Sequence, residues 1–311
     1  MIHYRAAAAA IFALMLQATT TAQEAYQGPI IDMHVHAYQQ VSPLFGIQFT
    51  NPLTGISYTT TADLEAHKAW TFDRMKAHRI VKAVVDYNPA WEAEDPDRVI
   101  PAKGGGNLET LRQGFMSGEL QIMAEMAPYY NGVQADDAAM DPYFELAESL
   151  EVPVGYHIYP GGPPGAMYAG YPGVRAENAH PMQIERVLVA HPKLKIYIMH
   201  AGWPYLEDMK ALMYAHPQLY VDLGVISWAL PRAEFHHFLK GLVDAGFGKR
   251  IMYGTDQMVF QGAFDQAIGN INSASFLSME QKADIFYNNA AAFLGLSPEE
   301  IEEHHLQAGN E

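Results

Sequence analysis

Two histidines stand two residues apart in the segment PIIDMHVHAYQ, which has the apolar composition of a buried β-strand over residues 29–35. Side chains alternate between the two faces of a strand, so His34, His36 and the preceding Asp32 are predicted to share one face. The other face would then carry Ile31, Met33 and Val35. Two imidazoles on one face can bind a single divalent metal ion, and Asp32 could orient one of them.

Four further residues with metal-binding side chains stand at the ends of other apolar segments. These are Glu125 in LQIMAEM, His157 in VPVGYH, His200 in KIYIMH and Asp256 in RIMYGTD. Imidazole nitrogens and carboxylate oxygens suit zinc, manganese, iron or nickel, and the chain has no cysteine. A buried cluster of such groups would be costly without a cation, so the joint pattern predicts a metal site.

Each of these residues has a simpler interpretation when it is taken alone. An HxH pair could lie on an exposed strand face, and His157 could be a core histidine that is hydrogen-bonded to a backbone carbonyl. Glu125 could be solvated or paired with a base, and Asp256 could cap a helix. The metal site is favoured because all these residues stand at strand ends that one fold would bring together.

The elements that would position these residues alternate between apolar strands and amphipathic helices. Eight strands are predicted, over 29–35, 80–86, 98–102, 120–126, 152–157, 195–200, 219–223 and 250–255. The clearest helical patterns cover 61–78, 141–150, 181–190 and 231–244. This alternation predicts a parallel sheet, and its length predicts a (β/α)8 TIM barrel over residues 28–296 with a C-terminal tail over 297–311. In such a barrel the carboxyl ends of the strands surround one axis, where the six candidate ligands can meet.

Two long loops leave the carboxyl ends of predicted strands, over residues 37–60 and 159–174. Tyr159, Tyr168 and Tyr171 suggest that the second loop forms an ordered pocket wall. The repeated pattern AHP places His191 and His216 in turns at helix ends, so no catalytic role is expected for them.

Residues 1–22 have the pattern of a secretory signal peptide, with Arg5 before the apolar run 6–16 and a plausible cleavage site after Ala22. An apolar run of this length is shorter than the ~20 residues that span a bilayer, although an uncleaved anchor is the alternative. We therefore expect a secreted or periplasmic protein that has no membrane contact after cleavage. The net charge of −16 argues against nucleic-acid binding.

Taken together, the motifs resemble the amidohydrolase superfamily, in particular its amidohydrolase-related (amidohydrolase 2) branch, over about residues 28–296. DMHVH resembles the first-strand motif, which implies that His34 and His36 bind metal, and VPVGYH implies the same for His157. IMHAGW implies that His200 binds a second metal or holds the attacking water. YGTD implies that Asp256 binds metal and shuttles a proton.

The residue at the position of Glu125 differs between members of this superfamily. Its segment MAEMAP is similar to members in which a glutamate bridges two metal ions, whereas the decarboxylase branch works with one ion. We therefore expect a divalent metal, with zinc the first choice and two ions favoured over one. The resulting hypothesis is a hydrolase that uses a metal-activated water on a small-molecule amide, lactone, ester or phosphoester. Asp256 would act as general base and then acid, and His200 would hold the second ion or stabilise charge.

Two alternatives remain open from the sequence. One is a metal-dependent non-oxidative decarboxylase, for which Arg175 is the candidate cation for a substrate carboxylate. The other is a periplasmic binding protein that keeps the barrel without turnover. The sequence leaves the identity of the substrate and the oligomeric state open, and formation of a homo-oligomer is one of the options.

Overall fold

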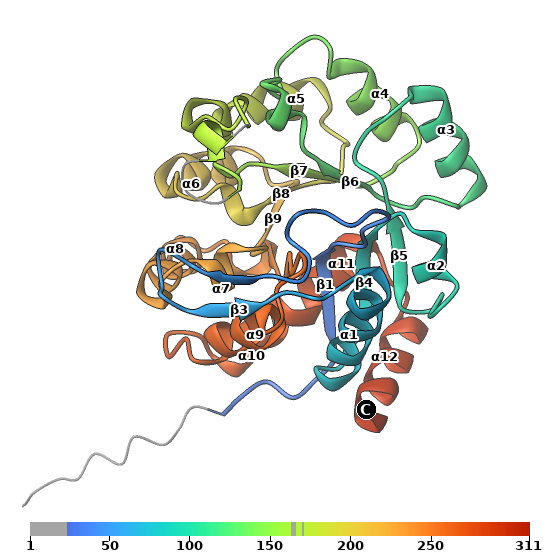
Figure 1. Cartoon of the computed structure of the whole chain (residues 1–311). Coiled ribbons are helices and arrows are strands. Elements are labelled where there is room, and N and C mark those ends of the chain that lie inside the picture. Colours follow the sequence, from blue (N-terminus) through green and yellow to red (C-terminus); the bar gives the residue numbers. More distant parts are fainter. Residues whose placement is uncertain (1–23, 163–165, 170) are drawn as a thin grey trace, which may run out of the picture.

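Eight parallel strands form a closed barrel, as the sequence predicts. The computed structural model describes residues 24–162, 166–169 and 171–311, so the expected signal peptide over 1–22 lies outside the described residues. The barrel strands are β1 (Ile30–Val35), β4 (Ile80–Asp86), β5 (Val99–Ala102), β6 (Met123–Met126), β7 (Val154–His157), β8 (Ile196–Met199), β9 (Leu219–Asp222) and β10 (Ile251–Met252) (Figure 1).

The strands pair in two runs, β1-β4-β5 and β10-β9-β8-β7-β6. A parallel bridge between Ala102 and Ile122 joins β5 to β6. On the other side, the amide of Met33 donates to the carbonyl of Tyr253, 3.0 Å away, and joins β1 to the end of β10. These two links close the ring, so the carboxyl ends of all eight strands open at the same end.

Helices surround the barrel on its outer face (Figure 1). The longer ones are α1 (Leu64–Ala77), α3 (Leu108–Ser117), α4 (Asp141–Ser149), α5 (Glu185–Ala190), α6 (Leu206–Ala215), α8 (Arg232–Asp244), α9 (Ala263–Asn272), α11 (Asn289–Leu294) and α12 (Pro298–Asn310). Short helices are α2 (Pro89–Glu92), α7 (Ile226–Ala229) and α10 (Met279–Ala283), followed by a π-helical turn over Asp284–Asn288. The predicted helices at 61–78, 141–150 and 231–244 correspond to α1, α4 and α8, and the one at 181–190 begins with a 3₁₀ turn (Pro181–Ile184) before α5.

Side-chain caps explain where several helices begin. Asp63 accepts a hydrogen bond from the amide of Ala66 at the start of α1, and Asn107 accepts from two amides at the start of α3. Ser297 and Glu300 form a reciprocal capping box at the start of α12. Residues 297–311, which the sequence assigns only to a tail, therefore form an ordered helix. None of the helices in the described part of the chain is long and apolar enough to cross a membrane.

The strict alternation expected along β1 is not kept. Ile31 and Met33 pack with Tyr197 and Met252 in the cluster that fills the barrel interior, whereas Val35 packs in the cluster between barrel and helices. The pairing of β1 with β4 shifts register between Asp32 and Val35, and this irregularity changes which side chains face inward. The apolar residues of β1 therefore do not share one outer face.

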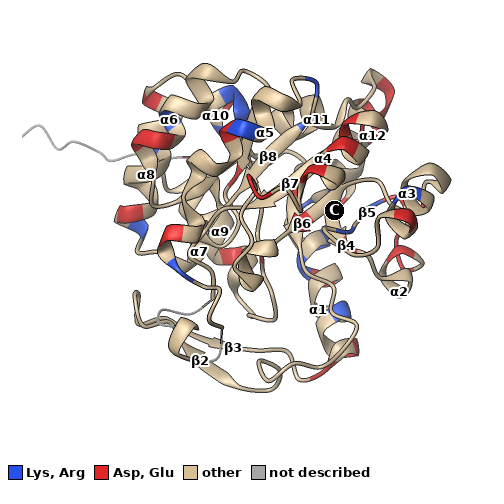
Figure 2. Cartoon of the chain, turned by 90° about the horizontal axis from the view of Figure 1, so that it is seen from above, with Lys and Arg blue, Asp and Glu red and all other residues tan. Residues whose placement is uncertain are grey.

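The loop expected over residues 37–60 contains an antiparallel hairpin of β2 (Gln48–Thr50) and β3 (Ser57–Thr59). The Nδ2 of Asn51 donates to the carbonyl of Ala229 at 2.7 Å, and Thr60 pairs with Phe260. These contacts dock the hairpin on α7 and on the loop after β10. Figure 2 shows that charged residues lie mainly on the outer helices and that the hairpin carries none.

Helices α11 and α12 cover the amino-terminal end of the barrel. Phe293 of α11 and Ala308 of α12 belong to the interior cluster. Arg98, only 2 % exposed, lies at the same end and donates to Asp95 at 3.0 Å and to the Glu311 carboxylate at 2.5 Å. Its guanidinium also donates to the carbonyl of Ile80. This one buried side chain therefore ties α12 to the start of β4 and β5.

We expect Arg98→Ala to lower the free energy of unfolding by about 2–4 kcal/mol, because it leaves two carboxylates and a carbonyl without their donor. Reversible urea unfolding of the variant measures this loss. Glu311→Gln retains an acceptor for Arg98 and should cost about 1 kcal/mol or less. An unfolding midpoint for Arg98→Ala equal to that of the wild type would show that this contact does not hold the helix in place.

Candidate metal centre

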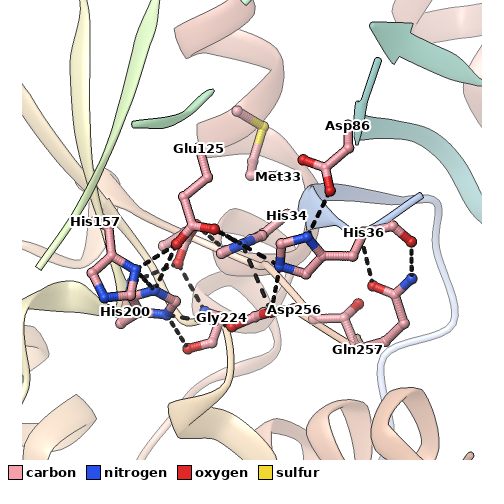
Figure 3. Close-up of polar contacts among 12 residues, drawn as sticks. Met33, His34, His36, Asp86, Glu125, His157, His200, Gly224, Asp256 and Gln257 are labelled. Carbon is pink, nitrogen blue, oxygen red and sulfur yellow. Dashed lines mark hydrogen bonds and ion pairs between the residues drawn. The ribbon is translucent and has the colours of Figure 1, made fainter. Parts of the chain in front are cut away.

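All six predicted ligands gather at the carboxyl end of the barrel (Figure 3). They lie on or directly after β1, β6, β7, β8 and β10, and they are His34, His36, Glu125, His157, His200 and Asp256. Their side chains form two neighbouring groups. Cluster A comprises His34, His36 and Asp256, and cluster B comprises Glu125, His157 and His200.

In cluster A, the ring nitrogens of two histidines face one carboxylate. The Nε2 of His36 lies 2.9 Å from Oδ1 of Asp256, and the Nε2 of His34 lies 3.8 Å from the same oxygen. The His34 Nε2 and the Asp256 Oδ1 are both buried without a hydrogen-bond partner. Buried polar atoms without partners are costly, and a divalent cation placed among these atoms would satisfy them.

In cluster B, two backbone carbonyls fix the tautomers of the histidines. The Nε2 of His157 donates to the carbonyl of Tyr159 at 3.0 Å, and the Nδ1 of His200 donates to the carbonyl of Gly224 at 3.1 Å. In the neutral rings the other nitrogens are then acceptors. These acceptors, Nδ1 of His157 and Nε2 of His200, lie 3.0 Å apart.

A carboxylate completes cluster B. The Oε1 of Glu125 lies 2.5 Å from Nδ1 of His157 and 3.3 Å from Nε2 of His200. Burial lowers the pKa of His157, which favours its neutral form despite the neighbouring Glu125. Two lone pairs and a carboxylate oxygen therefore converge with no proton between the two rings, and this donor set fits a divalent cation.

Glu125 reaches both clusters, with a different carboxylate oxygen toward each. Its Oε1 belongs to cluster B, while its Oε2 lies 3.7 Å from Nε2 of His34 and 3.8 Å from Nε2 of His36. Figure 3 shows the carboxylate between the two clusters. The chain after β5 packs directly on this residue, since a Cβ on Gly104 would lie 1.7 Å from the Glu125 carbonyl oxygen. The glycines of RVIPAKGGG, which make that strand hard to recognise, thus permit the backbone approach that positions Glu125.

Two carboxylates that the sequence analysis missed hold the rings of cluster A. The Oδ2 of Asp86 lies 2.7 Å from Nδ1 of His36, and the Oδ2 of Asp222 lies 3.4 Å from Nδ1 of His34. Asp222 also accepts hydrogen bonds from the amides of His200 and Gly224. The hydrogen bond to Asp86 holds a proton on Nδ1 of His36, so the Nε2 of His36 faces Asp256 and Glu125. Asp222 places a carboxylate beside Nδ1 of His34 without a hydrogen bond. Asp86 ends the predicted strand 80–86, and Asp222 stands one residue before the end of the predicted strand 219–223, so the signal that identified the candidate ligands could have found both.

Asp32 has a different role from the one expected. Its carboxylate accepts from the backbone amide of His34 at 3.0 Å and from the amide and hydroxyl of Thr255. Asp32 therefore fixes the main chain of β1 against the segment after β10, while Asp222 contacts the His34 ring. Burial raises the pKa of Asp32 to about 7, although the bonds from Thr255 and His34 oppose this rise.

The electrostatics of cluster A indicate an excess of negative charge. Burial alone would lower the pKa of His34, but Asp256, Asp222 and Glu125 outweigh burial and raise it well above its usual value. Burial would raise the pKa of Asp256, but the histidines around it lower it. In the described part of the chain, the ion pairs of these carboxylates are all with histidines. Protons on the imidazoles thus supply positive charge that a metal ion would otherwise supply.

A cavity of about 820 Å³ borders the centre through Tyr159, and none of the six candidate ligands lines it directly. Tyr159 and Trp203 line it, and the Tyr159 ring lies 5.2 Å from the His200 ring and 5.8 Å from the Trp203 ring. Tyr168 also lines it, as expected for the loop over 159–174, whereas Tyr171 is not among the lining residues. His191 and His216 follow directly after α5 and α6 and contact Glu148 and Glu185, so they are turn residues outside the centre.

The comparison with protein families gives one match, to the amidohydrolase family model over residues 31–296. The chain belongs to the amidohydrolase family. The family and its structural neighbours are metal-dependent enzymes, and this chain is therefore a metal-dependent enzyme. No match is found among curated proteins.

Solved structures share the barrel of this amidohydrolase at low sequence identity. A 2,6-dihydroxybenzoate decarboxylase from Rhizobium has a TM-score of 0.55 at 15% identity, covering 87% of this chain and 99% of its own. A probable 2-pyrone-4,6-dicarboxylic acid hydrolase from Acinetobacter baumannii has a TM-score of 0.55 at 14% identity, covering 86% and 99%. A dihydroxybenzoic acid decarboxylase from a Polaromonas species, with bound manganese, has a TM-score of 0.53 at 14% identity, covering 74% and 86%.

We expect Asp86→Asn to weaken the binding of Zn²⁺ by about 10- to 100-fold, because an amide does not hold the proton on Nδ1 of His36 as a carboxylate does. Competition titration against a chromophoric chelator measures the affinity, and circular dichroism should report an unchanged fold. Asp244→Asn, which removes an exposed carboxylate paired with Lys240, serves as the control. Equal Zn²⁺ affinity for Asp86→Asn and the wild type would contradict the positioning role.

Proposed function

We propose that this amidohydrolase is a hydrolase with two divalent ions, one in each cluster, that acts on a small-molecule amide, lactone, ester or phosphoester. The observation that carries the proposal is the position of Glu125, whose two oxygens face different clusters. Among the described residues, His36 and His157 belong to no common group of ligand atoms close enough to bind one ion. The six candidate ligands therefore fit two ions better than one.

Zinc is the proposed metal, because four imidazoles and two carboxylates suit its preference for nitrogen and oxygen ligands. Manganese accepts the same donors, and one neighbouring decarboxylase holds it. When bound, the ions supply a Lewis acid for the substrate oxygen and an acidified water as nucleophile.

Asp256 is the proposed proton carrier. It is nearly fully buried, and the histidines around it keep its pKa low, so it is ionised and able to accept a proton at neutral pH. Its Oδ2 lies 3.7 Å from Nδ1 of His200, which links the two clusters. Asp256 would take the proton from the nucleophile during attack and return it to the leaving group. His200 would hold the ion of cluster B.

Non-oxidative decarboxylation is the second candidate, because several of the neighbouring barrels are by name decarboxylases of dihydroxybenzoates or of 5-carboxyvanillate. This reaction would need a cation for the substrate carboxylate. Arg175 lines the cavity, but its Nη2 lies 2.5 Å from Oε1 of Glu177, so its charge is already paired. This pairing favours hydrolysis.

We further propose that the chain is exported and that Ala22 precedes the cleavage site, as the pattern of its first 22 residues suggests. The substrate would then be a small molecule that reaches the periplasm or the exterior. Neither nucleic acid nor a membrane is expected as a partner, and self-association is left open.

Activity against a defined panel tests the proposal. Zinc-loaded protein should hydrolyse at least one of phenyl acetate, γ-butyrolactone, acetanilide and 4-nitrophenyl phosphate, and it should release no CO₂ from 2,6-dihydroxybenzoate. Glu125→Gln should lower kcat/KM by about a hundredfold or more, because the shared ligand is lost. Glu148→Gln is the matched control, since it alters a Glu–His pair outside the centre. Release of CO₂ without hydrolysis would favour the decarboxylase, and the absence of both reactions would contradict the enzyme proposal for these substrate classes.

A further inference from the structure

We propose that the cavity beside the metal centre selects uncharged substrates that carry an aromatic or acyl group, and that it disfavours substrates that carry a carboxylate. This inference rests on the proposed hydrolytic function and names the substrate class of the same site. It is carried by the shape of the cavity, by the charge of its lining and by the charge of the centre itself.

The cavity has room for an aromatic or acyl group next to the reacting bond. Its volume of about 820 Å³ lies within the ~300–1,000 Å³ that small-molecule sites occupy. The ring of Tyr159 contacts the rings of both His200 and Trp203, so this side chain borders cluster B and the cavity. A substrate with an apolar group packed on Trp203 would therefore extend past Tyr159 toward cluster B. Leu53, at the tip of the β2–β3 hairpin, also lines the cavity.

The segments around the cavity carry almost no charge. Residues 37–62 and 152–174 contain no aspartate, glutamate, lysine or arginine, and Figure 2 shows the uncharged hairpin. Arg175 is the one basic residue among those that line the cavity. Glu177 lines it as well and pairs with Arg175. A substrate carboxylate would have to compete with Glu177 for this guanidinium.

The metal centre does not supply the missing positive charge. Four carboxylates lie in the centre or directly behind its histidine rings, namely Asp86, Glu125, Asp222 and Asp256. Two divalent ions would bring four positive charges against these four carboxylates, and a single ion would bring two. In either case the loaded centre has no surplus positive charge to attract an anion.

Equilibrium binding of two ketones tests the inference without turnover. Acetophenone and 4-acetylbenzoate differ by one carboxylate, and neither has a leaving group. Calorimetry on the zinc-loaded protein should give at least about tenfold tighter binding of acetophenone. Trp203→Ala should weaken the binding of acetophenone, which places the ligand in this cavity. Equal or tighter binding of 4-acetylbenzoate by the wild type would overturn the inference.

Glu177→Gln tests the part played by the ion pair. It frees Arg175 and should reduce the preference for acetophenone by about threefold, the scale of an exposed ion pair. Adding Arg175→Met should remove this gain. Glu280→Gln, which removes an exposed carboxylate beside Lys249, controls for the loss of one negative charge. A preference unchanged by Glu177→Gln would contradict the role of the pair.

A matched pair of esters then separates the inference from the proposed function. Phenyl acetate should show a higher kcat/KM than 4-acetoxybenzoate by about tenfold or more. If neither these esters nor the lactone, amide and phosphoester of the panel are hydrolysed while acetophenone still binds more tightly, the hydrolase proposal fails and the cavity inference stands. If both esters are hydrolysed at equal rates and both ketones bind equally, the cavity inference fails and the hydrolase proposal stands. Lys103, an exposed residue directly after β5, is another cation that could bind a substrate carboxylate. If the protein prefers the carboxylated ligands and Lys103→Met abolishes that preference, the inference is wrong.

Discussion

The carboxylate of Glu125 is the interaction on which the centre depends, because its two oxygens face different histidine clusters. Its Oε1 faces His157 and His200, while its Oε2 faces the Nε2 atoms of His34 and His36. Its main chain is fixed from behind by Gly104, where any side chain would collide with the Glu125 carbonyl. The glycine-rich turn after β5, the shared carboxylate and the two clusters therefore form one unit.

Around this carboxylate, each histidine is held by a partner on the ring nitrogen that faces away from the clusters. Asp86 and Asp222 hold the rings of His36 and His34, and backbone carbonyls hold those of His157 and His200. The inner ring nitrogens thus face the clusters before any cation binds, so less reorganisation of the side chains is needed on binding. The cost is a concentration of buried negative charge, which appears in the raised pKa of His34.

Much of this arrangement could be predicted from the sequence. The apolar segments indicate the strands, and a (β/α)8 barrel brings the carboxyl ends of all its strands to the same end. All eight strands were predicted in this way, and the six candidate ligands lie together at the end of the barrel where they were expected. The rest depended on tertiary detail. Asp86 and Asp222 also stand at strand ends, but each contacts the outer nitrogen of a histidine ring and does not itself face a cluster. The docked hairpin depends on Asn51 reaching Ala229, a contact that no local pattern encodes. The irregular register of β1 changed which of its apolar residues face inward.

The most direct test of the central claim is anomalous diffraction, at the zinc absorption edge, from crystals of the zinc-loaded protein. The account predicts two peaks on opposite sides of the Glu125 carboxylate, one beside Oε2, His34, His36 and Asp256, and the other beside Oε1, His157 and His200. A single fully occupied peak, or a pair of peaks from which the Glu125 carboxylate is turned away, would contradict it.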